Sequence, residues 1–169
     1  MNIEKKSFQN KKIQIIEGTI IAKNSKIAIL TPRFNNFINQ NLLYAAIDTL
    51  KRIGKVQDNN ITVIKIPGSY EIPIIANLIT QSLRYHGIIA LGTIIKGETV
   101  HFDKLTSDIT TQISNIIIKH NIPIALGILM TDNIEQAIHR SGTKLGNKGS
   151  EAALTILEMI NIIKIIQKS

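Results

Sequence analysis

The chain has 169 residues, close to the size at which one domain builds one hydrophobic core, and 44% of them are hydrophobic, so a disordered chain is not expected. It contains no cysteine, which excludes disulfides, thiolate metal sites and a cysteine nucleophile. The net charge is +8, but the basic residues are scattered along the chain, which argues against a nucleic-acid-binding surface.

The start of the chain, MNIEKKSFQNKK, is polar and lacks the apolar stretch of a secretory signal. No window contains the roughly 18 consecutive apolar residues of a membrane span. We therefore expect a cytoplasmic protein that does not enter membranes. We expect a single domain over residues 1–169, in which residues 1–25 form an N-terminal arm whose segment IQIIEGTII is a candidate edge strand.

After the arm, short apolar runs rich in isoleucine alternate with segments of helical apolar spacing. In chain order, we expect strand 27–30, helix 36–53, strand 61–66, helix 71–84, strand 87–95, helix 102–120, strand 124–130, helix 134–140 and helix 150–167. Strands that alternate with helices argue for right-handed crossovers and a parallel sheet. Near-continuous isoleucine in the strands fits burial of both sheet faces. The sequence therefore predicts an α/β fold with helices on both sides of a parallel sheet.

Four unusual loops follow the four expected strands. They are TPRFNN, PGSYEIP, KGETVHF and TDNIEQ. In an open parallel sheet these loops lie at one edge, and ligands bind beyond the carboxyl ends of the strands. The loops expected at the opposite edge, GKVQDNN, RYHG and KHNIP, are plain polar turns. This asymmetry predicts a small-molecule site at the carboxyl edge of the sheet.

The loop KGETVHF has the features of an anion site. Gly97 permits a backbone turn that a side chain would obstruct. The amides of Glu98 and Thr99 lead into a helix, and the first N–H groups of a helix bind phosphate because they have no partner within it. The positive potential there keeps the ring of His101 neutral, so that it can exchange protons with a substrate. The alternative is that Thr99 only caps the helix and His101 is a surface residue.

The other loops supply candidate binding residues, each with a structural alternative. Glu71 and nearby amides can hydrogen-bond the edge of a heterocycle, or Ser69 can cap a helix with Glu71 at its positive end. Phe34 can stack on a flat substrate or serve as an ordinary packing residue. Arg140 can grip a phosphate, although the glycines that follow it more often build a packing or assembly surface.

Metal and dinucleotide sites are not expected. The chain has no HExxH, Walker or GxGxxG pattern. His86, His120 and His139 lie in expected turns or beside charges, without the spacing of metal ligands. The residues therefore argue against a metal site and a dinucleotide site.

Four stretches together resemble the 6,7-dimethyl-8-ribityllumazine synthase family of riboflavin synthesis. They are RFN, PGSYEIP, ALGTIIKGETVHFD and TDNIEQAIHRSGTKLGNKGSEAA, in the family's order and at about its spacing, between about residues 25 and 165. The resemblance implies a flavodoxin-like three-layer α/β/α sandwich with a four-stranded parallel sheet. It also implies a transferase that condenses 5-amino-6-(D-ribitylamino)uracil with 3,4-dihydroxy-2-butanone 4-phosphate and releases phosphate and water, without a metal or cofactor.

The resemblance implies which residues surround the uracil substrate. Carried over by position, they are Phe34, Ser69, Tyr70, Glu71, Thr93, Ile94 and Ile95. Phe34 stacks on the uracil ring, and Glu71 faces the ribityl chain. The last three residues present backbone groups to the ring.

The resemblance also implies how the phosphorylated substrate is held. The amides of Glu98 and Thr99 bind its phosphate, and His101 is the catalytic residue that transfers protons. Leu126 and Arg140 come from the neighbouring subunit, and Arg140 grips the same phosphate. The resemblance thereby implies a site shared between two copies of the chain.

The resemblance further implies assembly as pentamers, which in many members of the family form an icosahedral shell. The stretch GTKLGNKG lacks the insertion of members that stop at pentamers, and this favours the shell. Riboflavin synthase is a candidate partner. The alternative interpretation is a flavodoxin-like FMN-binding module, but TPRFNN lacks the Ser/Thr-rich phosphate loop that such a module needs.

Overall fold

The computed structural model describes residues 13–97 and 101–168. The strands are β1 (Ile27–Pro32), β2 (Ile61–Ile66), β3 (Gly87–Ile95) and β4 (Ile124–Thr131). The helices are α2 (Asn36–Asp48), α3 (Ile72–Gln81), α4 (His101–His120), α5 (Ile134–Arg140) and α6 (Lys148–Lys168). Single 3-10 or π-helical turns cover Thr49–Ile53, Asp58–Asn60 and Ser69–Glu71. Each strand and helix expected after the arm is present, with ends that differ by a few residues.

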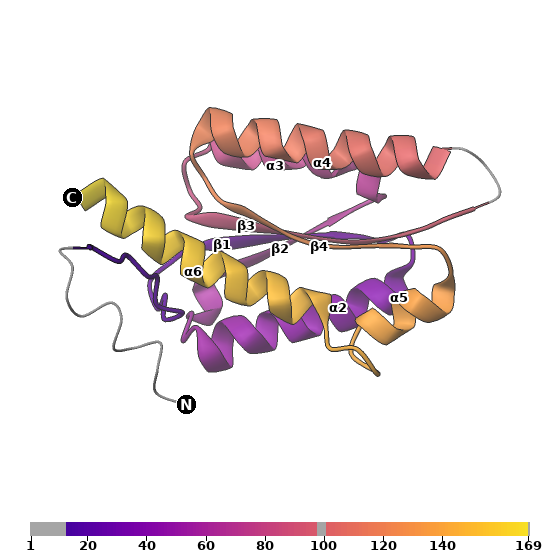
Figure 1. The fold of residues 1–169 in the computed structure, drawn as a ribbon, viewed down its shortest axis with the longest axis horizontal. Coiled ribbons are helices and arrows are strands. Elements are labelled where there is room, and N and C mark those ends of the chain that lie inside the picture. Colours follow the sequence, from indigo (N-terminus) through magenta and orange to yellow (C-terminus); the bar gives the residue numbers. More distant parts are fainter. Residues whose placement is uncertain (1–12, 98–100, 169) are drawn as a thin grey trace.

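The four strands form one sheet in the order β2-β1-β3-β4, and all neighbouring pairs are parallel. Helices α3 and α4 cover one face of the sheet, and α2, α5 and α6 cover the other (Figure 1). This arrangement confirms the predicted three-layer α/β/α fold with a four-stranded parallel sheet. Because the strand order reverses between β1 and β3, the carboxyl ends of these two strands flank the switch point of the sheet.

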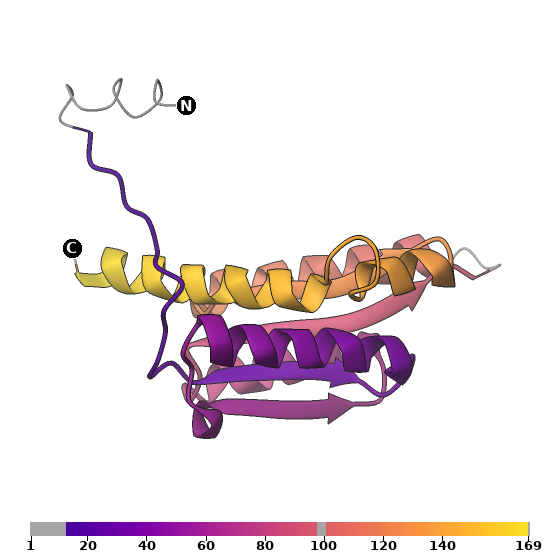
Figure 2. The same ribbon diagram turned by 90° about the horizontal axis from the view of Figure 1, so that it is seen from below.

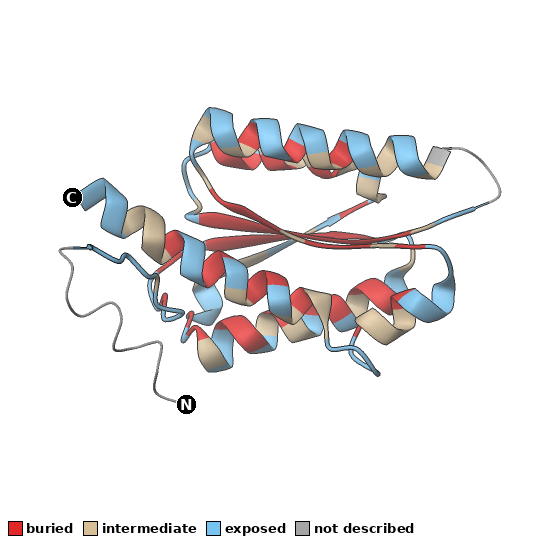
Figure 3. Ribbon diagram, in the orientation of Figure 1, coloured by how far each residue is buried: buried red, intermediate tan, exposed pale blue. Residues whose placement is uncertain are grey.

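Alternate strand residues feed two separate hydrophobic clusters. Ile29 and Leu91 belong to the cluster under α2 and α6, whereas Leu30 and Ala90 belong to the cluster under α3 and α4. This division between two clusters follows from the two-residue period of a strand, which turns successive side chains to opposite faces of the sheet. Figure 3 shows the central strands β1 and β3 and the edge strand β4 buried over most of their length. The isoleucine-rich runs therefore reflect burial on both faces, as predicted.

The described part of the N-terminal arm, from residue 13, has an irregular backbone and adds no strand to the sheet. The segment crosses the C-terminal half of α6 (Figure 2), where the side-chain amide of Asn161 donates to the carbonyls of Thr19 (2.6 Å) and Ile21 (3.0 Å). The side chains of Ile13 and Ile15 are exposed. The candidate edge strand is thus not paired within this chain, because its apolar residues meet no neighbouring strand there.

A glycine allows α2 and α6 to pack closely. A Cβ atom at Gly149 would overlap the backbone carbonyl of Leu42 in α2. The N–H of Gly149 donates to Oδ1 of Asn147 at 2.8 Å in the turn that starts α6.

We expect Gly149→Ala to destabilise the protein by about 1–3 kcal/mol, because the added methyl group must push the two helices apart. The control is Gly97→Ala, since a Cβ at Gly97 would meet no atom within 4 Å. Thermal unfolding of both variants checks this expectation. Equal unfolding midpoints for the two variants would contradict it.

His86 lies at the amino edge of the sheet, in the loop between α3 and β3. Its Nδ1 accepts a hydrogen bond from the backbone N–H of Lys26 at 2.9 Å. Partial removal from water lowers the pKa of His86, and the positive charge of Lys164 lowers it further. The neutral form of this ring is therefore the one that suits the folded protein.

Because the unfolded chain binds the His86 proton more readily, stability should be full above about pH 6.5 and decrease as the pH falls through the lower pKa of the folded state. The variant His86→Asn can still accept the Lys26 N–H but cannot titrate. Its unfolding midpoint should fall less than that of the wild type in thermal scans from about pH 8 to about pH 5. Parallel curves for the two proteins would refute the assignment.

Candidate active site

The two central strands separate at the carboxyl edge of the sheet. The β1–β3 ladder runs from Ile27↔Gly87 to Leu30↔Ala90, whereas the β3–β4 ladder continues to Ile95↔Thr131. The last five residues of β3 therefore extend beyond its pairing with β1 (Figure 1). The ladder between β1 and β3 thus stops at the switch point, which is where an open parallel sheet binds ligands, and we call this break in the pairing the notch.

Phe34 stands on the β1 side of this notch. The chain leaves β1 still bonded to the β2 side, since the N–H of Arg33 donates to Ile66 (2.7 Å) and that of Phe34 to Pro67 (3.1 Å). The side chain of Phe34 is 72% exposed. Such exposure is unfavourable for an ordinary packing residue and leaves the ring free to stack on a planar molecule.

Asn35 connects the β1 loop to β3. It has a left-handed backbone conformation (φ 57°) at the start of α2, but its side chain does not cap the helix. Instead, the side-chain amide donates to the carbonyl of Thr93 at 3.0 Å. The side chain of Asn35 thus joins the β1 loop to β3 instead of capping α2.

The loop after β2 brings Ser69, Tyr70 and Glu71 to the same edge. A Cβ atom at Gly92 of β3 would come within 2.9 Å of Oγ of Ser69, so the Ser69 hydroxyl lies directly over β3. Oε2 of Glu71 accepts the N–H of Gly68 at 2.9 Å, which holds the turn closed. Tyr70 is 67% exposed. The turn is thus fixed by the carboxylate of Glu71 and not by the hydroxyl of Ser69.

The end of β3 contributes backbone more than side chains. Thr93 and Ile94 are buried, and Ile95 is half-buried against the α2–α6 cluster. The carbonyl of Thr93 faces the β1 side, as its bond from Asn35 shows. Because successive residues of a strand alternate, Ile95 presents its backbone to the same side.

The predicted phosphate cradle is only partly described. Glu98 and Thr99 lie outside the described residues, and so does the side chain of His101. His101 is the first residue of α4, whose start follows β3 at the carboxyl edge. The expectation that a side chain would obstruct the turn at Gly97 is not supported, because a Cβ there would meet open space.

Leu126 and Arg140 occupy other parts of this chain. Leu126 lies in the edge strand β4, where it pairs with Ala90 of β3. Its side chain packs against the α3–α4 cluster. Arg140 ends α5, and its guanidinium is 3.5 Å from Oε2 of Glu151 in α6. None of the described contacts joins either residue to Phe34, Ser69 or Thr93.

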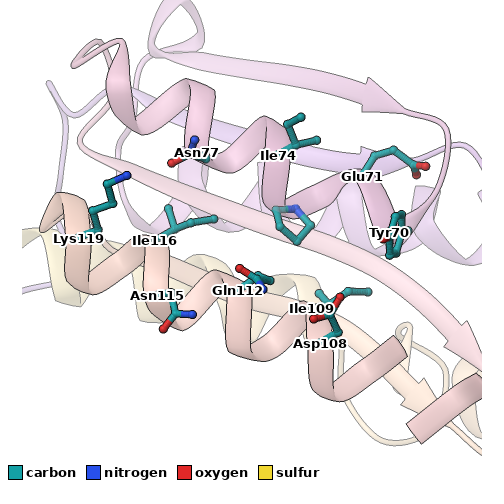
Figure 4. Close-up of a pocket in the computed structure, with 11 residues that line it drawn as sticks. Tyr70, Glu71, Ile74, Asn77, Asp108, Ile109, Gln112, Asn115, Ile116 and Lys119 are labelled. Atoms are coloured by element: carbon teal, nitrogen blue, oxygen red, sulfur yellow. The ribbon is translucent and has the colours of Figure 1, made fainter. Parts of the chain in front are cut away.

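Two features of this region were not predicted from the sequence. A groove of about 610 Å³ runs from Tyr70 and Glu71 along the space between α3 and α4 to Lys119 (Figure 4). The second feature is Asn39, a fully buried polar residue of α2 that bonds to Thr93. Its helical spacing with the buried Leu42, Leu43 and Ala46 was the available signal, because an asparagine on an apolar helix face needs buried polar partners.

Across residues 13–97 and 101–168, no three histidine, aspartate or glutamate side chains come together in a way that could hold a metal ion. None of the helices in the described part of the chain is both long and apolar enough to cross a bilayer.

Comparison with known proteins identifies the family. The family model for 6,7-dimethyl-8-ribityllumazine synthase matches residues 24–164. Proteins named 6,7-dimethyl-8-ribityllumazine synthase from Yersinia pestis (strain Pestoides F) and Yersinia pseudotuberculosis serotype O:1b (strain IP 31758) are each 52% identical over 155 residues, which cover 92% of this chain and 99% of the relative. These matches do not favour the FMN-binding alternative. The chain belongs to the 6,7-dimethyl-8-ribityllumazine synthase family.

Proposed function

We propose that this chain condenses 5-amino-6-(D-ribitylamino)uracil with 3,4-dihydroxy-2-butanone 4-phosphate at the carboxyl edge of the sheet. The observation that carries the proposal is the convergence of Phe34, Ser69 and Thr93 on the notch between β1 and β3 in a member of this family. The substrate amine forms an imine with the ketone and releases one water, phosphate is then eliminated, and ring closure onto the remaining carbonyl carbon releases a second water to give 6,7-dimethyl-8-ribityllumazine. The product then serves riboflavin synthesis in the cytoplasm.

The uracil substrate enters the notch between the three loops. Its ring stacks on the exposed face of Phe34, since a flat heterocycle gains contact area and removes the phenyl ring from water. Backbone groups of Thr93 and Ile95, which face the β1 side, hydrogen-bond the ring edge, and Ile94 lies between them in β3. Ser69, Tyr70 and Glu71 close the other side, with Glu71 toward the ribityl chain.

The phosphorylated ketone binds at the start of α4. The amides of Glu98 and Thr99 hold its phosphate, because the positive end of the helix dipole stabilises an anion there. His101 exchanges protons with the amine and with the oxygen that leaves as water. A neutral imidazole suits both directions of transfer near neutral pH.

This division of labour explains why so few catalytic groups are needed. Holding two reactants side by side contributes up to about 7–11 kcal/mol to catalysis in well-oriented cases. One general acid–base group typically adds about 10²–10⁴-fold. The condensation therefore depends chiefly on how well the notch and the helix start position the two substrates.

The site is completed by a second copy of the chain in a homo-oligomer. The neighbouring subunit supplies Leu126 as an apolar wall and Arg140 as a phosphate ligand. Support comes from the exposed apolar side chains of Tyr70, Ile74 and Leu78, a row spaced by four residues whose first two members line the α3–α4 groove. A partner that covers this row would remove apolar surface from water. We propose a pentamer, with the icosahedral shell as its further assembly and riboflavin synthase as a candidate partner.

For proton transfer, we expect His101→Ala to lower kcat by about 10²-fold with little change in either KM, since the low end of the typical acid–base contribution applies when proximity dominates. The control is His120→Ala at the other end of α4, where Nε2 contacts Asn77 at 3.0 Å. The assay mixes both substrates and follows the fluorescence of the lumazine. A His101→Ala enzyme with wild-type kcat would remove this residue from the mechanism.

For phosphate binding, we expect Arg140→Ala to raise the KM for the butanone phosphate by about tenfold and to leave the KM for the uracil substrate unchanged, because a charge-assisted contact to one substrate is lost. The control is Arg52→Ala, which breaks an exposed ion pair with Asp48 (3.0 Å). An equal rise of both KM values would contradict the assignment.

The same two variants test whether the site is shared between subunits. When His101→Ala and Arg140→Ala chains are coexpressed, about one site in four of the mixed oligomers should combine an intact His101 with an intact Arg140 from its neighbour. The mixture should then regain activity that neither variant shows alone at low butanone phosphate. No recovery in oligomers shown to be mixed by native mass spectrometry would place both residues in the same subunit's site.

A further inference from the structure

Asn39 carries a polar side chain into the core of the protein. It lies on the inner face of α2 and is fully buried. Burying a side-chain amide is unfavourable unless its donors and acceptor are hydrogen-bonded. Both ends of this amide are in use: Nδ2 donates to the carbonyls of Phe34 (2.7 Å) and Pro32 (3.2 Å), and Oδ1 accepts from Oγ1 of Thr93 (2.7 Å).

These bonds lie where the sheet itself stops connecting β1 to β3. Beyond Leu30↔Ala90 no ladder joins the two strands, and Pro32 has no N–H to donate. The amide of Asn39 replaces the missing ladder, since it donates to the end of β1 and accepts from β3. The bond from Asn35 to the carbonyl of Thr93 adds a second bridge.

The ring of Phe34 depends on this bridge for its position. Because 72% of its side chain is exposed, packing does little to hold it. Its backbone is instead held by two hydrogen bonds. The N–H of Phe34 donates to the carbonyl of Pro67 (3.1 Å), and the carbonyl of Phe34 accepts from Nδ2 of Asn39 (2.7 Å). Loss of the Asn39 contact would leave the carbonyl of Phe34 without this hydrogen bond, and the loop would then be joined to β3 only through Asn35.

We propose that Asn39, held in turn by the hydroxyl of Thr93, is a positioning residue that fixes the loop carrying Phe34 for binding of the uracil substrate. The inference rests on the proposed function, because the stacking role of Phe34 is itself a proposal. The amide has no contact with substrate and acts through Phe34. It therefore affects binding of the aromatic substrate and leaves the phosphorylated one untouched.

Thr93→Val is the most conservative test, because it keeps the shape of the side chain and removes the hydroxyl that donates to Asn39. We expect the KM for 5-amino-6-(D-ribitylamino)uracil to rise by about tenfold, with kcat and the KM for the butanone phosphate unchanged within about twofold. This pattern is expected when one substrate loses a contact that is equally strong in the bound state and in the transition state. Thr93→Ser keeps the hydroxyl and should restore the wild-type KM. Asn39→Leu should raise the same KM and lower the unfolding midpoint further.

The matched control is Thr80→Val in α3. Thr80 is also fully buried, and its hydroxyl donates to the carbonyl of Asn77 at 2.8 Å. This variant should lower the unfolding midpoint by a similar amount and change neither KM. If Thr93→Val and Thr80→Val gave the same kinetics, Asn39 would serve stability alone and the proposal would be overturned.

Phe34→Ala separates this proposal from the site assignment on which it rests. In the Phe34→Ala background, Thr93→Val should not raise the uracil KM further, because no ring remains to be positioned. Additive effects of the two substitutions would overturn the positioning role and leave the stacking role of Phe34 intact. A wild-type uracil KM for Phe34→Ala would overturn both.

Discussion

The separation of β1 from β3 after Leu30↔Ala90 is the constraint on which the rest of this structure depends. Up to that point, the strands are held by a continuous ladder and by hydrophobic clusters on both faces of the sheet. Beyond it, backbone groups and loops are released at the switch point and become available to a ligand. The part of the sheet that is packed on both faces thus ends where the candidate site begins. The well-packed core therefore fixes the positions of the strand ends that carry the site.

The residues around the notch suit a reaction that joins two molecules. Those that the structure describes include an exposed ring at Phe34, a hydroxyl at Ser69 and the backbone of β3, and among them no nucleophile is paired with a base. Side-chain amides of Asn35 and Asn39 join the loop that carries Phe34 to β3 by hydrogen bonds. Such an arrangement favours preorganisation over chemical participation, which is the larger contribution when the main barrier is bringing two reactants together.

Much of the fold could be predicted because local signals and tertiary burial agree. The strands 61–66 and 87–95 match residue for residue, since each is an apolar run bounded by polar turns, glycine or proline. The helix expected over 71–84 ends at Gln81, because Leu83 adopts a left-handed backbone conformation (φ 52°) that stops it. The N-terminal arm was the segment predicted least well, since IQIIEGTII has the residues of a strand but no neighbouring strand within this chain.

The sequence by itself determined the order of the elements and the edge at which the four unusual loops meet, because apolar spacing and parallel topology are local properties that follow directly from the residues. It also pointed to Phe34, Ser69 and Glu71 as neighbours of one site. Only the tertiary structure decided that Asn39 bonds to Thr93, 54 residues away, and that Glu71 closes its own turn. Such contacts join residues distant in the chain, and the hydrogen-bond partner of a buried amide is set by the packing of whole elements and not by the residues beside it.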